Sequence, residues 1–367
     1  MMKVLFAVVD GGGNIPPQLG VARALRSRGV QVRFLGHDGV ADRLRDAGFD
    51  FESFSTGTQF DPCRRSRGTG VMGGIARVIT DRRFSRDIIA AARHHGADVV
   101  VVDMLLTAAS ADVVAAGLPT VVFVHCFYRA VQDAAAGPLG WLLRLRGVRP
   151  LGAEHNGALQ IVAARADLDP VRGVPPVHHV GVVWQGVPTQ SQPRPVPHVL
   201  ISLSTCAYAG QRRMLQHILD AVEGLPIRAA VTVGPAIDGS GLRVPANATI
   251  HRWLDHDEVL ATASLVIGHG GHSTAMRALS FGVPLVIMPA NGLIDQKRVG
   301  AAIQRAGAGM LLPKSAGAQR IRAAVTAVLG DQRYREAAGL LGEQIRRRDG
   351  AEAAADAICR LVKTPSC

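Results

Sequence analysis

A glycine-rich turn that holds two histidines is the part of the sequence with the clearest chemical meaning. It follows the apolar run Leu265–Ile267 and reads Gly268-His269-Gly270-Gly271-His272-Ser273-Thr274. A helical pattern begins there, and the first N–H groups of a helix have no partner within it and carry partial positive charge. Glycine also lets the backbone turn tightly and approach a ligand. The turn therefore predicts an anion site suited to phosphate, with the imidazoles and hydroxyls as further donors.

An acid and an amide follow one strand later. Asp295-Gln296 begins a helical pattern after the apolar run Leu285–Met288. The carboxyl ends of parallel strands meet at one edge of a sheet, so this pair is expected near the glycine turn. A carboxylate and an amide can both bind hydroxyl groups. The expected ligand therefore carries phosphates and hydroxyls together.

Strands and helices alternate along the chain, which predicts an α/β protein with two doubly wound, Rossmann-like domains. The first series of apolar runs is Val4–Val9, Val30–Leu35, Phe49–Phe54, Asp98–Asp103 and Thr120–Val124, and the second is His198–Leu203, Arg228–Val233, Thr249–His251, Leu265–Ile267, Leu285–Met288 and Met310–Leu312. The predicted boundaries are 1–184 for the first domain, 185–197 for a proline-rich linker, 198–348 for the second domain, and 349–367 for a C-terminal helix that can pack back on the first. Ligands of such sheets bind beyond the carboxyl ends of the strands, so the Gly11–Pro17 and Gly268–Thr274 turns are expected to border a cleft that the domains face.

Composition excludes several classes of function. The chain has 367 residues, 48% of them apolar, and a net charge of +12, but lysine is nearly absent and the arginines are scattered. Few aromatic residues accompany the arginines, so nucleic acid is not an expected partner. No apolar run reaches the ~18 residues of a transmembrane helix and no cleavage site follows the N-terminus, so a cytoplasmic protein without stable membrane insertion is expected. The five cysteines lack paired spacing and are expected to be reduced thiols.

Three segments of the first domain allow more than one interpretation. Thr56–Gly74 is rich in glycine and arginine and is either a solvated loop or a lid over a substrate with negative charge. Phe127–Val148 is interpreted as an irregular segment that can form an apolar wall. The Gly11–Pro17 turn invites a dinucleotide interpretation, but Pro16-Pro17 replaces the last glycine of that fingerprint and no acid closes the second strand. A nicotinamide cofactor is therefore not expected.

The motifs together resemble a known family. The run His269–Thr274, with Gly282-Val283-Pro284 and Asp295-Gln296, is similar to the donor-site signature of sugar-nucleotide-dependent glycosyltransferases of the GT-B fold. Within the UDP-glycosyltransferase superfamily, the bacterial natural-product enzymes are the members that it resembles. The similarity extends to Gly13–Pro17, Ser202–Thr205 and Trp253-Leu254, and it covers nearly the whole chain.

The resemblance implies roles for these residues. The implied donor contacts are His269, Gly270, Gly271, His272, Ser273 and Thr274 at the diphosphate together with Ser204 and Thr205, Trp253 and Leu254 at the nucleobase, and Asp295 and Gln296 at the sugar hydroxyls. The implied reaction is an inverting transfer from a UDP- or dTDP-sugar. It needs no metal, and no cofactor beyond the nucleotide sugar itself.

Asn14 departs from the family pattern. This position is commonly the histidine general base, paired with an acid at the end of the fourth strand, where Asp103 stands. An amide cannot take a proton near neutral pH, so Asn14 can orient an acceptor but not activate it. Three interpretations follow: Asp103 or His125 is the base, the acceptor needs little activation, or the chain has lost catalysis and serves as a partner protein. The first is favoured, with Asp103 ahead of His125.

The acceptor side completes the functional prediction. The residues expected to contact the acceptor are Asn14, Ile15, Arg64, Phe127 and Trp141. The expected partners are a nucleotide-sugar donor and a small natural-product aglycone. The identity of the sugar is left open, and a deoxysugar is one option. Whether the chain forms a homodimer is also left open. A lipid-linked acceptor at a membrane surface fits the positive charge, and a non-catalytic partner protein fits Asn14, so both stay as alternatives.

Two pairs of carboxylates have the spacing of metal ligands. They are Asp167 with Asp169 and Asp255 with Asp257. Neither pair follows an apolar strand in a nucleotide domain. Both are therefore interpreted as turn or helix-start residues, and no metal site is expected.

Overall fold

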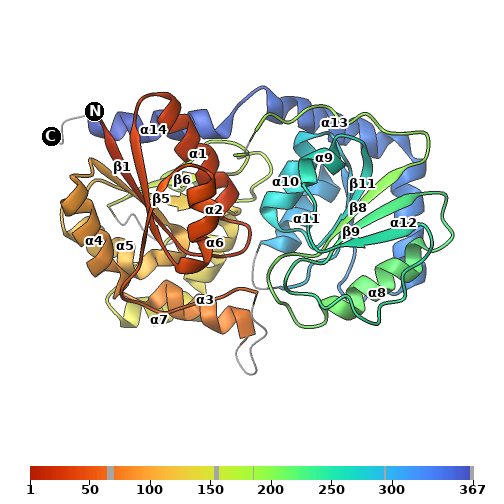
Figure 1. The fold of residues 1–367 in the computed structure, drawn as a ribbon, viewed down its shortest axis with the longest axis horizontal. Coiled ribbons are helices and arrows are strands. Elements are labelled where there is room, and N and C mark those ends of the chain that lie inside the picture. The colour runs from red at the N-terminus through yellow and green to blue at the C-terminus, as the bar shows by residue number, and fades with distance from the viewer. Residues whose placement is uncertain (64–69, 153–156, 185, 293–294, 364–367) are drawn as a thin grey trace. The chain divides into compact units, whose positions relative to one another are not determined.

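The computed structural model describes residues 1–63, 70–152, 157–184, 186–292 and 295–363 (Figure 1). The chain divides into two compact units. The first consists largely of Met1–Pro62, Ser66–Gly186 and Asp349–Cys367, and the second of Val187–Arg348. Each unit is built on one parallel sheet flanked by helices, which confirms the predicted α/β fold class.

The sheet of the first unit has seven strands in the order β3-β2-β1-β4-β5-β6-β7. Their bounds are Lys3–Val8 (β1), Gln31–Gly36 (β2), Asp50–Ser53 (β3), Val99–Asp103 (β4), Thr120–Val124 (β5), Leu159–Val162 (β6) and Val177–His179 (β7). The five strands expected from apolar runs are present. The last two were not predicted, because β6 and β7 are short and β7 consists of one valine and two histidines.

Alternate side chains of each strand point to opposite faces of this sheet. Val4, Phe6 and Val8 of β1 enter one core together with α1 (Ile15–Ser27) and α14 (Gly350–Lys363). The intervening residues of β1 enter a second core with α3 (Gly70–Thr80), α4 (Phe84–His95) and α5 (Thr107–Ala115). Each fully buried large apolar side chain contributes roughly 1.5–3 kcal/mol. The near-continuous apolar character of β1 and β4 is therefore explained by burial on both faces.

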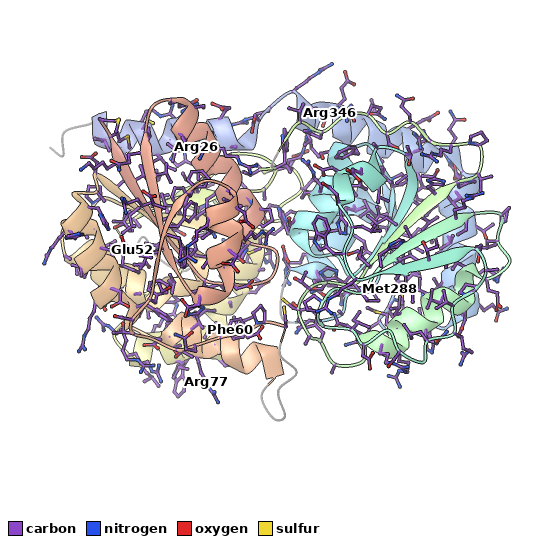
Figure 2. All side chains as sticks on the ribbon, viewed as in Figure 1. Arg26, Glu52, Phe60, Arg77, Met288 and Arg346 are labelled. Atoms are coloured by element: carbon purple, nitrogen blue, oxygen red, sulfur yellow. The ribbon has the colours of Figure 1, made fainter. Side chains whose placement is uncertain are left out.

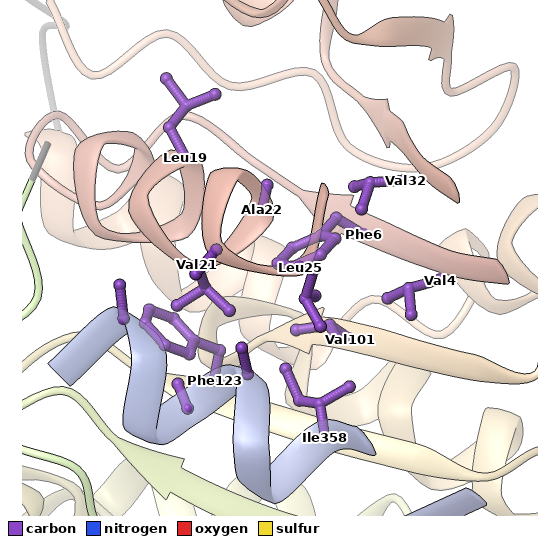
Figure 3. Close-up of a cluster of buried hydrophobic side chains, with 14 of the residues drawn as sticks. Val4, Phe6, Leu19, Val21, Ala22, Leu25, Val32, Val101, Phe123 and Ile358 are labelled. Carbon is purple, nitrogen blue, oxygen red and sulfur yellow. The ribbon is translucent and has the colours of Figure 1, made fainter. Parts of the chain in front are cut away.

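The C-terminal helix α14 belongs to the first unit. Its small residues Ala351, Ala354 and Ala355 allow close packing beside α1, and Ile358 lies in the same core (Figure 3). Arg28, which follows α1, forms salt bridges with Glu352 at 2.6 Å and with Asp356 at 2.8 Å, both on α14. These contacts hold a segment more than 300 residues away in the sequence against the first helix.

The segment Phe127–Val148 contains two helices, so its interpretation as irregular was wrong. Tyr128–Ala136 forms α6 and Pro138–Leu145 forms α7. Gly137 separates the two helices and Pro138 begins the second, a position that proline favours. Helices of nine and eight residues are too short to give a distinctive periodic pattern in sequence.

The sheet of the second unit has six parallel strands in the order β10-β9-β8-β11-β12-β13. Their bounds are His198–Ser202 (β8), Arg228–Thr232 (β9), Ala248–His251 (β10), Ala263–Gly268 (β11), Leu285–Ile287 (β12) and Gly309–Leu311 (β13). The helices are Gln211–Val222 (α8), His256–Leu260 (α9), His272–Ser280 (α10), Gln296–Arg305 (α11), Ala318–Gly330 (α12) and Gln332–Arg346 (α13). Helices α8 and α12 pack on one core of this sheet, and all six strands were predicted.

The lengths of the helices and the state of the cysteines bear on two expectations from the sequence. Within the described ranges, no helix is both long and apolar enough to span a bilayer. Cys63, Cys126, Cys206 and Cys359 form no disulfide with one another.

Candidate active site

The glycine turn after β11 forms a helix N-terminus as predicted. Helix α10 begins at His272, and its N-cap residue Gly271 provides no side-chain cap for the free N–H groups. Gly270 has a φ of +78°, and a Cβ on it would lie 2.8 Å from the carbonyl oxygen of Gln296. A Cβ on Gly271 would lie 2.3 Å from Nε2 of His269. Glycine is therefore required at both positions, and the exposed end of α10 can accept an anion.

His269 is nearly buried beside this turn. It is 6% exposed, and its Nδ1 lies 3.5 Å from the carbonyl oxygen of Ser202, at the end of the adjacent strand β8. Burial lowers the pKa of His269 to about 4, although the Ser202 carbonyl and the charge of Asp295 oppose the shift. A carbonyl only accepts, so the neutral ring carries its proton on Nδ1 and Nε2 is an acceptor. His269 would thus donate to a diphosphate through Nε2 only after it takes up a proton, and its predicted role stays a prediction.

His272 and Asp295 face each other across the same site. The Nδ1 atom of His272 lies 3.5 Å from Oδ2 of Asp295, and the two side chains are only 7% and 5% exposed. Gln296 begins α11, and its Oε1 accepts hydrogen bonds from the backbone N–H groups of Ala290 and Asn291, both at 2.9 Å. The carbonyl of this amide therefore holds the loop after β12, which leaves the NH₂ group as the part of Gln296 that can bind a sugar hydroxyl.

The loop after β8 adds a strained residue. Ser204 has a φ of 90°, which is uncommon for any residue with a side chain, and its Oγ accepts from the N–H of Cys206 at 3.0 Å. Such strain is often retained at functional sites. Thr205 beside it is exposed, and Leu254 is half-buried. Trp253 is 75% exposed beyond β10, so its indole is available to stack on a base. The donor roles given to these residues stay predictions.

Two residues at this edge were missed in the sequence. Burial raises the pKa of Tyr208, whose phenol is within reach of Ser204 and near Asp295. Lys314 follows β13, and its Nζ donates to the carbonyl oxygens of Ala209 at 2.7 Å and Ala290 at 2.6 Å. Lys314 thereby joins the loops after β8 and β12. Its place just after the last predicted strand was the only sequence signal for it.

Asp103 is the centre of a polar cluster in the first unit. It ends β4, is 0% exposed, and accepts from the N–H of Leu105 at 2.9 Å. Its Oδ2 accepts from Nδ2 of Asn14 at 2.7 Å and from Nε2 of Gln18 at 2.6 Å. These three donors hold the carboxylate in one fixed orientation. Sequence reasoning missed Gln18, although it lies four residues after Asn14 and therefore on the same face of α1.

Asn14 is fully occupied within this cluster. Its Nδ2 also donates to the carbonyl oxygen of Val9 at 2.7 Å, and its Oδ1 accepts from the N–H of Gly11 at 2.8 Å. The residue is 1% exposed. Its amide is thus hydrogen-bonded to Asp103 and to the turn after β1, and the expectation that Asn14 contacts the acceptor stays a prediction.

His125 follows β5 and lies beside the same carboxylate. Its Nε2 is 3.4 Å from Oδ1 of Asp103, and its side chain is 16% exposed while that of Asp103 is 0% exposed. This separation is longer than a good hydrogen bond, and catalytic contacts of this kind often shorten when substrate binds. Of the two predicted bases, only His125 has a surface through which a proton can be taken from a bound molecule.

Comparison with known proteins identifies the fold family. Residues 217–358 match the model of the erythromycin biosynthesis protein CIII-like C-terminal domain. The calicheamicin glycosyltransferase CalG4 superposes with a TM-score of 0.77 over 100% of both chains, at 22% identity. The spinosyn rhamnosyltransferase SpnG, solved with thymidine diphosphate and with spinosyn aglycone, gives 0.71 over 99% of this chain and 100% of its own, at 19% identity. This chain has the GT-B fold of the glycosyltransferases.

Relatives in sequence agree with this family. A PGL/p-HBAD biosynthesis glycosyltransferase of Mycobacterium tuberculosis (strain ATCC 25177 / H37Ra) is 32% identical over 226 residues, which are 56% of this chain and 50% of the relative. The 4'-demethylrebeccamycin synthase of Lentzea aerocolonigenes is 25% identical over 98% of this chain and 99% of its own. The alignment thus spans about half the length of the mycobacterial relative. The predicted resemblance to bacterial natural-product glycosyltransferases is confirmed.

The other residues predicted to contact the acceptor differ in their exposure. Ile15 and Phe127 are both 0% exposed and pack within the first unit, and their predicted contact with the acceptor stays a prediction. Trp141 on α7 is 64% exposed and stays a prediction. Arg64 lies outside the described residues.

Each carboxylate pair contains a residue that caps a helix. Asp255 is the N-cap of α9 and accepts from the N–H of Asp257 at 2.8 Å, as the helix-start interpretation required. Asp169 accepts from the N–H of Tyr128 at 2.6 Å and so caps α6 from a distant loop. Among the described residues, no group of three or more histidine, cysteine or acidic side chains is arranged to hold a metal ion.

Proposed function

We propose that this chain transfers a sugar from a UDP- or dTDP-sugar to a hydroxyl group of a small natural-product aglycone. The class of reaction rests on the GT-B fold and on the relatives that are named glycosyltransferases. The observation that carries catalysis is the His125–Asp103 pair. It supplies an imidazole and an oriented carboxylate although Asn14 occupies the position of the usual histidine.

The second unit is the proposed donor site. The N-terminus of α10 offers backbone N–H groups and a positive dipole to the diphosphate, and the loop after β8 closes on the same edge through Ser204 and Thr205. Asp295 and the NH₂ group of Gln296 are proposed to bind sugar hydroxyls. The thymidine diphosphate and aglycone bound to SpnG support a nucleotide-sugar donor and a small-molecule acceptor.

His125 is the proposed general base and Asp103 its positioning residue. With Nε2 turned to Asp103, Nδ1 takes the proton of the acceptor hydroxyl. The acceptor oxygen then bonds to the anomeric carbon as the bond to the nucleoside diphosphate breaks, so that the configuration inverts. The charge that leaves with the diphosphate is stabilised by the backbone N–H groups and the positive dipole at the N-terminus of α10. This helix end supplies partial positive charge where a metal would otherwise do so, and we therefore propose a metal-independent transfer.

Turnover with single-residue variants tests this assignment. The assay follows nucleotide release from UDP-glucose and dTDP-sugars with a panel of phenolic acceptors. His125→Ala is expected to lower kcat by about 10²–10⁴-fold and to leave nucleotide binding unchanged. The matched control is His94→Ala, because His94 is exposed on α4. If the wild-type chain binds nucleotide sugars and releases no nucleotide with any acceptor, it is a non-catalytic binding protein.

A further inference from the structure

The first unit has an arginine-lined pocket apart from the His125–Asp103 pair. Its volume is about 580 Å³ and it is open to solvent. Its lining consists of Thr58, Arg77, Thr80, Asp81, Arg82, Arg83 and Arg146. The lining thus holds four guanidinium groups and one carboxylate, together with two hydroxyl groups.

Two of the four arginines are neutralised by carboxylates. Arg83 contacts both oxygens of Asp81, with Nε at 3.0 Å and Nη2 at 2.7 Å. Burial alone would raise the pKa of Asp81, but hydrogen bonds from Arg83 and Thr58 lower it to about 2, so Asp81 is charged. Arg82 is paired with Asp112, with Nε at 3.1 Å. These two ion pairs fix the walls of the pocket. Because each arginine is matched by a carboxylate, Arg82 and Arg83 add little net charge to the pocket.

Arg77 and Arg146 provide the net charge of the pocket. Neither has a carboxylate within 4.0 Å among the residues that the structure describes. Arg146 is held by its Nη1, which donates to the carbonyl oxygen of Thr80 at 3.1 Å. Arg77 is exposed on the last turns of α3 and projects at the surface of the unit (Figure 2). The two threonine hydroxyls donate within the protein, Thr58 to Asp81 at 2.7 Å and Thr80 to the carbonyl oxygen of Ala76 at 2.9 Å. The two guanidinium groups, with N–H donors to spare, are therefore the groups that suit a phosphate or a carboxylate.

The pocket is connected to the proposed base through one helix. Helix α3 carries Arg77 and Thr80 and packs against Met104–Leu106, the short turn that begins directly after Asp103. The helix has 11 residues and is therefore about 16 Å long. Measured along α3, the pocket is thus within about one helix length of the Asp103 turn, and an acceptor has to be of comparable length to reach both.

We propose that this pocket binds an anionic group, a phosphate or a carboxylate, carried by the acceptor. The proposal rests on the proposed function, since it names a class of acceptor for that transfer. It predicts that the chain prefers acceptors with a charged group distant from the hydroxyl that receives the sugar. Arg77 is the specificity-determining residue, and Arg146 supplies the second guanidinium group of the site.

The first arm of the test measures binding of inorganic phosphate by NMR titration, without any donor. Arg77→Glu is expected to weaken binding at least about tenfold, and Arg77→Lys to retain most of it. The matched control is Arg93→Glu. Arg93 is exposed in the last turn of α4, whereas the pocket lies at the first turn of that helix, so the same change in charge should leave binding intact. Equal binding by Arg77→Glu and wild type would overturn the pocket.

The second arm measures kcat/KM for phenolic acceptors in matched pairs, one neutral and one with a carboxylate or phosphate. Wild type is expected to favour the anionic member at least about tenfold through KM, and Arg77→Glu to lose this preference. No preference in wild type would overturn the assignment to the acceptor. A second result would also overturn it. In that case the chain binds phosphatidylglycerol vesicles in preference to phosphatidylcholine vesicles, Arg77→Glu abolishes this binding, and inorganic phosphate does not bind. If turnover fails with every acceptor, the phosphate titration still decides whether the pocket binds anions.

Discussion

Each unit carries a histidine beside an aspartate at the carboxyl edge of its sheet, and the two pairs differ in their surroundings. In the first unit, Asp103 is enclosed and held by three hydrogen bonds, while its partner His125 is 16% exposed. In the second, His272 and Asp295 are both nearly buried, and His272 is the first residue of α10. A general base needs one fixed charge and one reachable imidazole, whereas a binding site needs a rigid surface. The same two residue types therefore suit acid–base chemistry in one unit and donor binding in the other.

Double-mutant cycles at the two pairs give the largest expected contrast. Asp103→Asn and His125→Ala should each lower kcat by about 10²–10⁴-fold, and the double variant should be little worse than either, because the pair acts as one unit. His272→Ala and Asp295→Asn should instead raise the KM for the donor by roughly tenfold. Steady-state kinetics with varied donor distinguishes the two patterns. A loss of kcat in His272→Ala equal to that in His125→Ala would contradict the division of roles.

Gly271→Ala tests whether the turn before α10 binds the nucleotide. The new Cβ would lie 2.3 Å from Nε2 of His269, so the ring or the turn has to move. The affinity for a nucleoside diphosphate, measured by calorimetry, should fall about 10–100-fold. Gly317→Ala is the matched control, since Gly317 is also a helix N-cap in the second unit and a Cβ there meets no atom within 4 Å. Equal losses in both variants would point to a general effect on folding.

Gln18→Met sharpens the account of the first pair. It removes the 2.6 Å hydrogen bond to Asp103 and leaves that carboxylate with two donors. The less stabilised negative charge should hold a proton on His125 more strongly, so the acidic limb of the kcat/KM profile should move to higher pH by up to about one unit. The free energy of unfolding should fall by about 1–3 kcal/mol. An unchanged pH profile with the same loss of stability would make Gln18 structural only.

The pH dependence of stability tests the burial of His269, with the smallest expected effect. Its pKa is about 4 in the folded chain and about 6.5 when unfolded, so the unfolded state binds more protons between these values. The contribution of the neutral His269 to the free energy of unfolding is fully present above pH 6.5. It is lost as the pH falls toward 4, by at most about 1.4 kcal/mol per pH unit. Urea unfolding at pH 7 and pH 5 should show a smaller difference for His269→Asn than for wild type. An equal difference would contradict a neutral, buried His269.

The sequence alone was sufficient wherever a local pattern dictates structure. The strands of the second unit followed from apolar runs, and the end of α10 followed from three glycines before a helical pattern. The short helices α6 and α7 and the strands β6 and β7 could not be predicted. Their stability comes from distant partners such as Asp169, which caps α6 from 41 residues away, rather than from their own periodicity.

Sequence by itself determined the fold class, the position of the helix end that can bind a phosphate, and the candidates Asp103 and His125. Those features depend on side-chain type and on neighbours along the chain. Only the tertiary structure decided how the candidates differ, because exposure and hydrogen bonding depend on residues brought together from separate strands and helices. Asn14, Gln18 and Leu105 enclose Asp103 and leave His125 as the reachable group. In the same way, the pocket at Arg77 forms where the end of α3, the residue before α4 and the residue after α7 come together with Thr58.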